Sequence, residues 1–222
     1  MTGTVIILNA GQATRLEGAA PYGIKSLVET VPGRVVLDDQ RAMFPGWDLY
    51  LAVASSTPPE VASSLRRPGV TPLSIPAQHR QGSSTATLRA AVEQLRSVGK
   101  ARPPFVCLYG DTVTADVFTD PIPRAWLGWS PASRMPGWHT RPWEIATYRN
   151  DGIVVEYRHA EHHTEKVHVG LFGWWDPDLP FAAGDDLLTR CARGKLIEVR
   201  GWWDVGDVPA LDRYRRHVTE GR

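Results

Sequence analysis

The first half of the chain contains several short apolar runs and one amphipathic segment. Val5–Leu8, Trp47–Ala54 and Phe105–Tyr109 are long enough for buried strands, and Val70–Ile75 is a further, shorter strand candidate. Over Leu88–Leu95, apolar residues fall three and four positions apart, which predicts one face of a helix. Strands that alternate with helices in this way predict a parallel α/β sheet.

The second half of the chain has a different pattern. Apolar or alternating runs at 144–148, 153–157 and 167–174 are separated by Asn150-Asp151-Gly152 and by a polar stretch. Because Asn-Asp-Gly between two such runs is a hairpin signal, we expect antiparallel strands added to the parallel sheet. The remaining predicted elements are helices at 36–43, 59–65 and 185–191, a strand at 195–199 and a terminal helix at 210–219.

A tryptophan-rich stretch lies between these halves. Residues 121–143 contain Trp126, Trp129, Trp138 and Trp143 among several prolines, and we interpret them as strands and irregular loops laid over the sheet. Such rings can stack on a sugar or surround a quaternary ammonium group. Packing in the core or at a subunit interface is their commoner use.

Composition indicates an ordinary soluble globular chain. Its 222 residues are 42% hydrophobic and 22% charged, which allows a sizeable core. The net charge of +1 offers no overall field for nucleic acid or an anionic membrane. Without a signal-peptide pattern or an apolar stretch of about 18 residues, a cytoplasmic location is expected. Cys107 and Cys191 are interpreted as two buried thiols.

The first candidate site follows the first strand. Gly11 and Ala13 have almost no side chain, so the turn can bring backbone N–H groups close to a phosphate. Arg15 adds a planar cation and Lys25 a compact one, which together suggest a polyphosphate site. A tight turn with a solvated Arg15 is the alternative for this stretch alone.

A second candidate segment leads into the predicted helix. Residues 78–87 are rich in Gly and Ser, and a helix N-terminus of this kind offers N–H groups to an anion or a nucleotide edge. An ordinary cap at Ser83 or Ser84 is the commoner use of such residues.

Two carboxylates complete the candidate chemistry. Asp111 follows the strand at 105–109, at the sheet edge where α/β ligands bind, although it could be a simple turn residue. Asp204 stands in the turn before the terminal helix, where Asp207 and Pro209 suit the first turn. Capping of the terminal helix accounts for one of Asp204 and Asp207, but not comfortably for both. A carboxylate beside a triphosphate favours magnesium.

Four segments together resemble the sugar-phosphate nucleotidylyltransferase family. The family's first strand, its Gly-rich turn with Thr-Arg-Leu and its Pro-Lys pair look like Leu8–Leu27. Its Gln-x-x-x-Gly loop, Gly-Asp pair and Trp-x-Asp-Val-Gly segment look like Gln78–Gly82, Gly110-Asp111 and Trp202–Gly206. Ala13, Ile24 and Asp207 stand where the family has Gly, Pro and Thr, and Glu-Lys-Pro has no clean counterpart.

The resemblance implies a fold and a reaction. The fold is Rossmann-like, three-layered and α/β, with a mixed, mostly parallel sheet. It forms one nucleotidyltransferase domain over residues 1–222, with a nucleotide-binding half at 1–120 and an acceptor-binding half at 121–222. The reaction transfers a nucleoside monophosphate from a nucleoside triphosphate to a sugar 1-phosphate or similar phosphomonoester, with Mg²⁺ as cofactor and pyrophosphate as product. The short length resembles compact members acting on N-acetylmuramate 1-phosphate, heptose 1-phosphate or phosphocholine, and a monomer or small homo-oligomer is expected.

The resemblance also implies residue roles. Arg15, Lys25 and Asp111 are the expected catalytic residues, and Asp111 with Asp204 would bind the metal. The acceptor would contact Trp143, Lys166 and Gly170. The expected nucleotide-binding residues are Leu8, Asn9, Ala10, Gly11, Gln12, Ala13, Thr14, Gln78, Gly82, Ser83 and Gly110.

Three other interpretations compete with this one. A glycosyltransferase on a related sheet could use Asp176-Pro-Asp178 as a metal-binding Asp-x-Asp. A nucleotide-binding module without catalysis is the second. A zinc site at His159, His162 and His163 lacks a suitable fourth ligand, so a solvated hairpin loop is favoured there.

Overall fold

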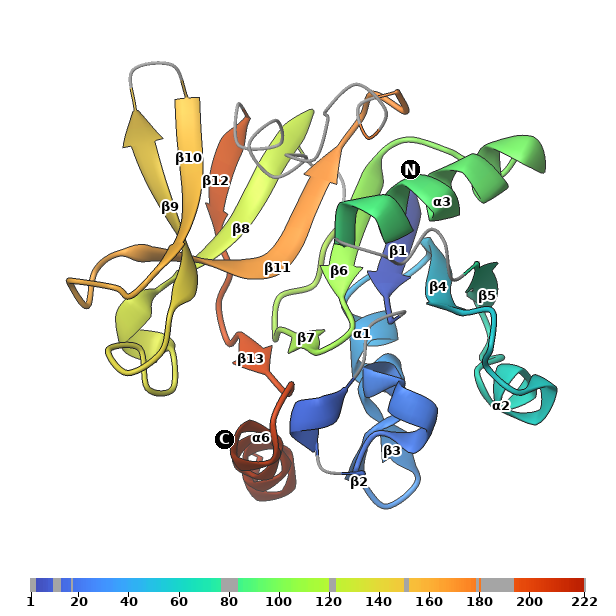
Figure 1. The fold of residues 1–222 in the computed structure, drawn as a ribbon, viewed down its shortest axis with the longest axis horizontal. Helices are drawn as coiled ribbons and strands as arrows, with labels where there is room; N and C mark the ends of the chain where they lie inside the picture. Colours follow the sequence, from blue (N-terminus) through green and yellow to red (C-terminus); the bar gives the residue numbers. More distant parts are fainter. Residues whose placement is uncertain are drawn as a thin grey trace.

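A nine-stranded sheet organises the computed structural model, which describes residues 3–9, 13–16, 18–76, 84–119, 123–149, 152–178, 180 and 194–221. The strand order is β10-β9-β11-β6-β1-β4-β5, with β8 beside β11 and β12 beside β8 (Figure 1). The strands are β1 (Thr4–Leu8), β4 (Asp48–Ala54), β5 (Val70–Ile75), β6 (Phe105–Tyr109), β8 (Ala125–Pro131), β9 (Trp143–Arg149), β10 (Gly152–Arg158), β11 (Lys166–Trp174) and β12 (Lys195–Glu198).

Smaller elements surround this sheet. Two short antiparallel pairs are β2 (Glu29–Val31) with β3 (Arg34–Val35), and β7 (Thr112–Val113) with β13 (Trp203–Asp204). The α-helices are α1 (Val36–Ala42), α2 (Pro59–Ser64), α3 (Ser84–Ser97) and α6 (Val208–Glu220), and the 3-10 helices are η1 (Thr14–Leu16), η2 (Pro21–Gly23), η3 (Lys25–Leu27) and η5 (Ala132–Arg134).

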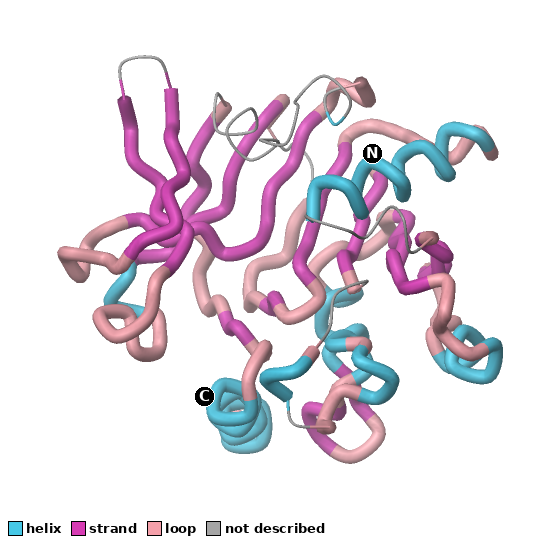
Figure 2. Tube along the Cα trace, viewed as in Figure 1, coloured by secondary structure: helices cyan, strands magenta, loops and turns pink. Residues whose placement is uncertain are grey.

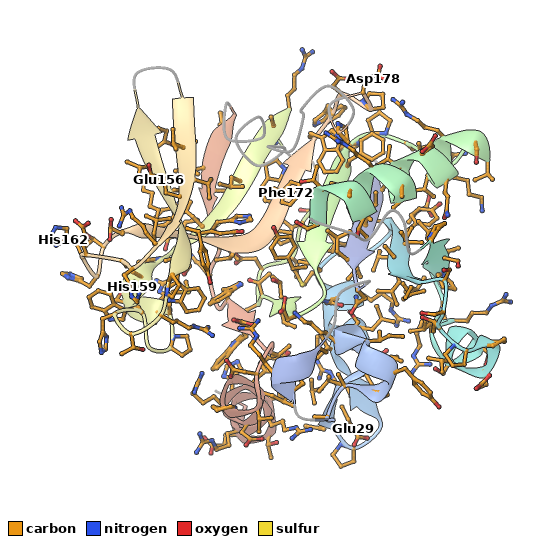
Figure 3. All side chains as sticks on the ribbon, in the orientation of Figure 1. Glu29, Glu156, His159, His162, Phe172 and Asp178 are labelled. Carbon is orange, nitrogen blue, oxygen red and sulfur yellow. The ribbon has the colours of Figure 1, made fainter. Side chains whose placement is uncertain are left out.

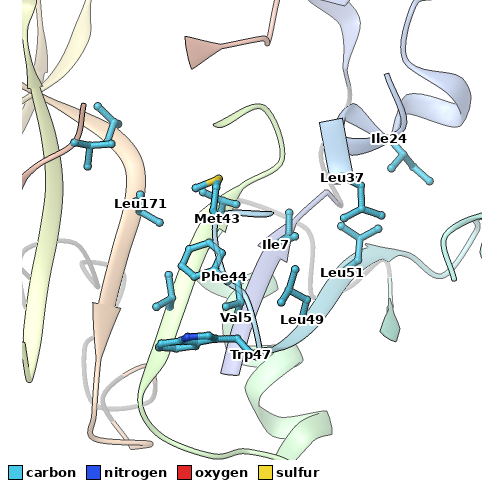
Figure 4. Close-up of a cluster of buried hydrophobic side chains, with 14 of the residues drawn as sticks. Val5, Ile7, Ile24, Leu37, Met43, Phe44, Trp47, Leu49, Leu51 and Leu171 are labelled. Carbon is cyan, nitrogen blue, oxygen red and sulfur yellow. The ribbon is translucent and has the colours of Figure 1, made fainter. Parts of the chain in front are cut away.

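The first half of the chain forms the parallel part of the sheet, as predicted. β1 pairs in parallel with β4 and β6, and β4 with β5. Because successive strand residues point to opposite faces, Ile6 packs with Leu88 and Val92 of α3, while Val5 and Ile7 pack on the other face. Figure 4 shows this second face, where Val5 and Ile7 lie near Leu37, Phe44, Trp47, Leu49 and Leu51.

The second half adds antiparallel strands, which confirms the predicted mixed sheet. β11 runs antiparallel to β6, β8 and β9, and β9 and β10 form the predicted hairpin pair. In Figure 2 helix α3 lies across the upper part of the parallel strands, α2 lies to their right, and α1 and α6 lie below the sheet.

The tryptophan-rich stretch differs from the expectation that it lies over the sheet. Its β8 strand is part of the sheet, between β11 and β12, since both of its faces are buried. Trp126 is fully buried and stacks on Phe118 with ring centroids 5.8 Å apart. Gly128 allows the close approach of β11, because an added Cβ would lie 2.9 Å from the Leu171 carbonyl oxygen.

Some predicted features lie outside the described residues, namely the helix at 185–191 with Cys191 and the tip of the hairpin at 150–151. Cys107 is buried in β6, as expected. None of the helices that the structure describes is both long enough and apolar enough to cross a membrane.

Asp207 caps the terminal helix α6. Its Oδ1 accepts a hydrogen bond of 2.8 Å from the Ala210 N–H, and its Oδ2 lies 3.2 Å from Nη1 of Arg141. We expect Asp207→Ala to lower the free energy of unfolding by about 1 kcal/mol, the usual cost of a lost cap. Asp207→Ser, which keeps a capping oxygen without the ion pair, should recover most of that loss in urea denaturation. Equal destabilisation by both variants would contradict the capping role.

Glu165 closes the loop between β10 and β11. The hydrogen bond from Arg158, with those from the backbone N–H groups of His162 and Glu161, outweighs burial and lowers the pKa of Glu165 from 4.5 to about 2. A carboxyl with a lower pKa in the folded state stabilises the fold above pH 4.5, and this stabilisation is lost as the pH falls towards about 2.

The thermal unfolding midpoint of Glu165→Gln should therefore lie below that of the wild type at pH 7. The difference should shrink as both proteins are measured at successively lower pH below 4.5. A difference that stays constant from neutral to acid pH would contradict this assignment.

Candidate active site

The carboxyl ends of β1 and β6 meet at a buried polar junction. Asn9, which follows β1, donates to the Ser26 hydroxyl at 2.7 Å and accepts from the Ser26 N–H at 3.0 Å. The Ser26 hydroxyl donates to Oε1 of Gln40, and Nε2 of Gln40 donates to the Gly110 carbonyl oxygen at 3.2 Å. Gly110 must be small, because an added Cβ would lie 2.5 Å from Oδ1 of Asn9. This junction fixes η3, which carries Lys25, beside the end of β6.

Three charged side chains converge next to this junction. Lys25 donates to Oδ2 of Asp111, and Nη2 of Arg15 lies 4.0 Å from the same oxygen. The Asp111 side chain is only 13% exposed, whereas that of Arg15 is 57% exposed. Arg15 is therefore free to meet a ligand from solvent, while Lys25 and Asp111 form the inner part of the site.

The short β7–β13 pair brings a second carboxylate to the same place. Thr112 of β7 lies opposite Asp204 of β13, and the Val205 N–H donates to the Asp111 carbonyl oxygen at 2.9 Å. Asp204 thus lies in a strand rather than in the expected turn, since the chain pairs with β7 before it enters α6. Asp111 and Asp204 are far apart in sequence but adjacent in the structure.

The two carboxylates surround Gly206. A Cβ added there would lie 2.6 Å from Oδ2 of Asp111, 2.7 Å from Oδ1 of Asp204 and 3.2 Å from Nη2 of Arg15. The two oxygens therefore approach one common point, and Mg²⁺ is bound by one or two carboxylates with phosphate oxygens and water. The residues present fit such an ion, although the described residues include no cluster of three His, Cys, Asp or Glu side chains.

Burial and the neighbouring charge of Asp111 raise the pKa of Asp204. The Gly206 N–H, Arg141 and Arg15 oppose this shift. Nη2 of Arg141 lies 3.1 Å from Oδ2 of Asp204, so a cation already compensates part of the crowded negative charge. Such crowding favours binding of a further cation between the carboxylates.

An open cavity of about 220 Å³ extends from the carboxylates. The Arg141 guanidinium lies 3.9 Å from the centroid of the Trp143 ring, and Trp143 meets Trp202 edge to face at 6.2 Å. The cavity is lined by Arg15, Tyr109, Asp111, Thr112, Arg141, Pro142, Trp143, Glu144, Tyr157, His168, Val169, Gly170, Trp202 and Asp204. One end of the site is thus charged, and its walls are largely aromatic.

Known proteins are similar to this chain in fold rather than in sequence. Neither a protein-family model nor a curated protein matches the chain. Solved structures match it over nearly its whole length. A putative glucose-1-phosphate thymidylyltransferase from Bacillus anthracis has a TM-score of 0.68 at 17% identity, with 96% of this chain and 94% of that chain covered.

Two further solved structures also match this chain over nearly its whole length. The CTP:phosphocholine cytidylyltransferase of Streptococcus pneumoniae has a TM-score of 0.65 at 12% identity, with 98% of this chain and 100% of that chain covered. The inositol-1-phosphate CTP transferase of T. maritima has a TM-score of 0.61 at 12% identity, with 99% of this chain and 97% of that chain covered. This chain shares the fold of these three solved structures. The predicted Rossmann-like α/β fold is confirmed.

Within this fold, many of the predicted residues fall into three groups. Arg15, Lys25, Asp111 and Asp204 come together at the carboxyl edge of the parallel strands. Trp143 and Gly170 line the cavity. The predicted residues that lie outside the described ones are Ala10, Gly11, Gln12, Gln78, Gly82 and Ser83.

The expected nucleotide-binding residues Asn9 and Gly110 have internal roles. Their polar groups bond to Ser26 and Gln40, so they support the site from below. Leu8 packs against the α3 side of the sheet. Ala13 and the backbone of Thr14 lead into η1, which presents Arg15.

Lys166 differs from its expected acceptor-binding place. It does not line the cavity, and its ammonium lies 5.1 Å from the Trp129 ring centroid and 4.7 Å from that of Tyr148. The reason is its position on β11 beside β9, where the aromatic rings of neighbouring strands offer cation–π contacts. The structure therefore gives no support to an acceptor contact by Lys166.

Two of the competing interpretations involve residues remote from this site. Asp178 pairs with Arg96 of α3, and the β11–β6 register places Trp174 opposite Phe105, at the other end of β6 from Asp111. Figure 3 shows Asp178 close to α3, and it shows His159 and His162 in an outer loop beyond β9 and β10. Neither Asp178 nor these histidines line the cavity.

The cavity lining also includes Arg141, Glu144 and His168, for which no motif predicts a role. His168 is a polar residue inside the apolar run at 167–174, and a buried polar side chain is a signal for a specific partner. Arg141 and Glu144 flank Trp143, but nothing in their spacing indicates Asp204 or His168 as their partners. Those partners come from distant segments.

Proposed function

We propose that the chain is a magnesium-dependent nucleotidyltransferase that transfers a nucleoside monophosphate from a nucleoside triphosphate to a sugar 1-phosphate or similar phosphomonoester. The observation that supports this proposal is the convergence of Asp111 and Asp204, from opposite halves of the chain, around Gly206. Arg15 and Lys25 adjoin the same carboxylates, and an aromatic cavity large enough for a small organic group opens beside them.

The reaction forms one P–O bond and breaks another. An oxygen of the acceptor phosphate attacks the α-phosphorus in line, and the bond from this phosphorus to the bridging β-oxygen breaks, so pyrophosphate leaves. Chemistry of this kind depends on positioning and charge neutralisation rather than on a covalent nucleophile. The site accordingly supplies charged groups and a shaped cavity.

Each charged residue has a proposed role in this reaction. Arg15 would bind the leaving β- and γ-phosphates from its exposed position, and Lys25 would bind the α-phosphate and the acceptor phosphate. Asp111 and Asp204 would hold Mg²⁺, which supplies neutralisation of the phosphate charges when bound. Ala10, Gly11, Gln78 and Gly82 are proposed, from the resemblance, to contact the base and ribose.

Pyrophosphate release tests this function. The common nucleoside triphosphates should be crossed, with Mg²⁺ present, against a panel of sugar 1-phosphates plus phosphocholine. Release that requires both substrates is the expected result, and the productive pair names the donor and the acceptor. No release with any pair, despite triphosphate binding, would favour a binding module. Consumption of a nucleotide sugar without pyrophosphate would favour a glycosyltransferase.

A further inference from the structure

The cavity contains a second polar centre, separate from the aspartates. The register between β9 and β11 pairs Ala146 with Lys166 and Ile145 with Val167, so Glu144 and His168 follow as the next cross-strand neighbours. Nδ1 of His168 lies 2.6 Å from Oε2 of Glu144. Both residues line the cavity, and among the described residues no hydrogen bond or ion pair joins either of them to Arg15, Lys25 or Arg141.

The Glu144–His168 pair leaves hydrogen-bonding capacity unused. The His168 side chain is fully buried, while that of Glu144 is 33% exposed. Among the described residues, Nε2 of His168 and Nε1 of Trp143 are buried without a hydrogen-bond partner, and Oε1 of Glu144 has none either. Buried polar groups in native proteins are normally satisfied, and Glu144 is the member of this pair that is partly exposed and can bind a ligand in the cavity.

Glu144 has the charge of a carboxylate at neutral pH. Burial raises the pKa of Glu144, but the hydrogen bond and the electrostatic effect of His168 outweigh burial and lower this pKa below its ordinary value. The three neighbouring cations are already engaged elsewhere, since Lys25 and Arg15 adjoin Asp111, and Arg141 adjoins Asp204 and Asp207. The Glu144 carboxylate therefore lines the cavity without an ion pair to any of these three cations among the described residues.

We propose that Glu144, oriented by His168, selects acceptors whose organic part presents hydrogen-bond donors or a positive charge, and disfavours acceptors that carry a carboxylate. This inference rests on the proposed function, because it assigns the aromatic cavity to the acceptor. The aromatic walls of Trp143, Trp202 and Tyr109 suit the apolar faces of a sugar ring or the methyl groups of an alkylammonium. Hydroxyl and ammonium groups share the chemistry that Glu144 recognises.

Steady-state kinetics with the isosteric variant Glu144→Gln test this inference. We expect the KM for the acceptor to rise about 10- to 100-fold, the effect of losing one charge-assisted hydrogen bond. The KM for the nucleoside triphosphate should change less than twofold, because Glu144 is separate from the carboxylates and cations of the triphosphate end. Glu156→Gln is the matched control, since Glu156 lies on the neighbouring strand β10 (Figure 3) and is not among the residues that line the cavity.

The wild-type protein provides a test that does not depend on folding of a variant. Its acceptor panel should include glucose 1-phosphate for hydroxyl groups, phosphocholine and phosphoethanolamine for ammonium groups, and glucuronate 1-phosphate for a carboxylate. We expect the protein to use the hydroxyl or the ammonium acceptors in preference to glucuronate 1-phosphate. The preferred acceptor then shows whether Glu144 binds hydroxyl or ammonium groups.

The outcomes separate this inference from the proposed function. Pyrophosphate release with an unchanged acceptor KM in Glu144→Gln would overturn the inference alone. Preference of the wild type for glucuronate 1-phosphate would do the same. No release from the wild type with any pair would overturn the proposed function, and the inference with it.

Discussion

Asp111→Asn is expected to lower kcat for pyrophosphate release about 10³-fold, because charge stabilisation by a bound metal contributes several kcal/mol to such reactions. Asparagine keeps the shape of the side chain but removes the negative charge that Lys25 and Arg15 face. The fold should survive, since the Asp111 backbone, whose carbonyl oxygen accepts from the Val205 N–H, is unchanged. Single-turnover rates at saturating substrate, with thermal unfolding of the same samples, measure both effects.

Asp116→Asn is a matched control for this experiment. Asp116 lies five positions further along the chain, accepts a hydrogen bond from the Arg200 N–H and does not line the active-site cavity. Its replacement makes the same chemical change outside the site, so kcat should stay within about twofold of the wild type. An Asp111→Asn protein that retains a tenth of the wild-type rate would contradict the metal-binding role.

Gly206→Ala is expected to lower kcat about 100-fold, the typical cost of misplacing reacting groups by about 1 Å. The new Cβ would lie 2.6 Å and 2.7 Å from the Asp111 and Asp204 oxygens, so at least one carboxylate must move. The Gly206 backbone does not have a positive φ angle, and alanine can adopt its conformation without strain. The defect should therefore arise from the carboxylates rather than from the fold.

A magnesium titration tests whether displacement of the Asp111 and Asp204 carboxylates causes the defect in Gly206→Ala. The Mg²⁺ concentration for half-maximal rate should rise in Gly206→Ala, while the acceptor KM changes little because Glu144 and His168 are not displaced. A variant with wild-type magnesium dependence and a rate within threefold of the wild type would show that the two carboxylates do not act together.

The sequence predicts the parallel half of this fold well. The strands Thr4–Leu8, Asp48–Ala54 and Phe105–Tyr109 each follow from an apolar run, and α3 follows from three-and-four spacing. Residues directly after such strands are also predictable, because parallel strands share one carboxyl edge. Arg15, Lys25 and Asp111 meet there for this reason.

The role of Asn9 was less predictable. It stands in the expected nucleotide-binding turn, but its side chain bonds to Ser26 and fixes η3 instead. Polar residues can serve a ligand or the supporting structure equally well, and spacing alone does not distinguish these uses. Lys166 illustrates the same point, since its cation lies over Trp129 and Tyr148 rather than in the cavity.

The element types, the mixed sheet and the charged edge are predictable from the residues alone, because strand and helix periodicity and strand-end position are properties of neighbouring residues. Which distant residues meet follows from the packing of the whole chain. The pairing of β13 with β7 brings Asp204 beside Asp111, and the pairing of β11 with β9 brings His168 within hydrogen-bonding distance of Glu144. Such contacts depend on the pairing of segments that lie tens of residues apart, and no local pattern encodes that pairing.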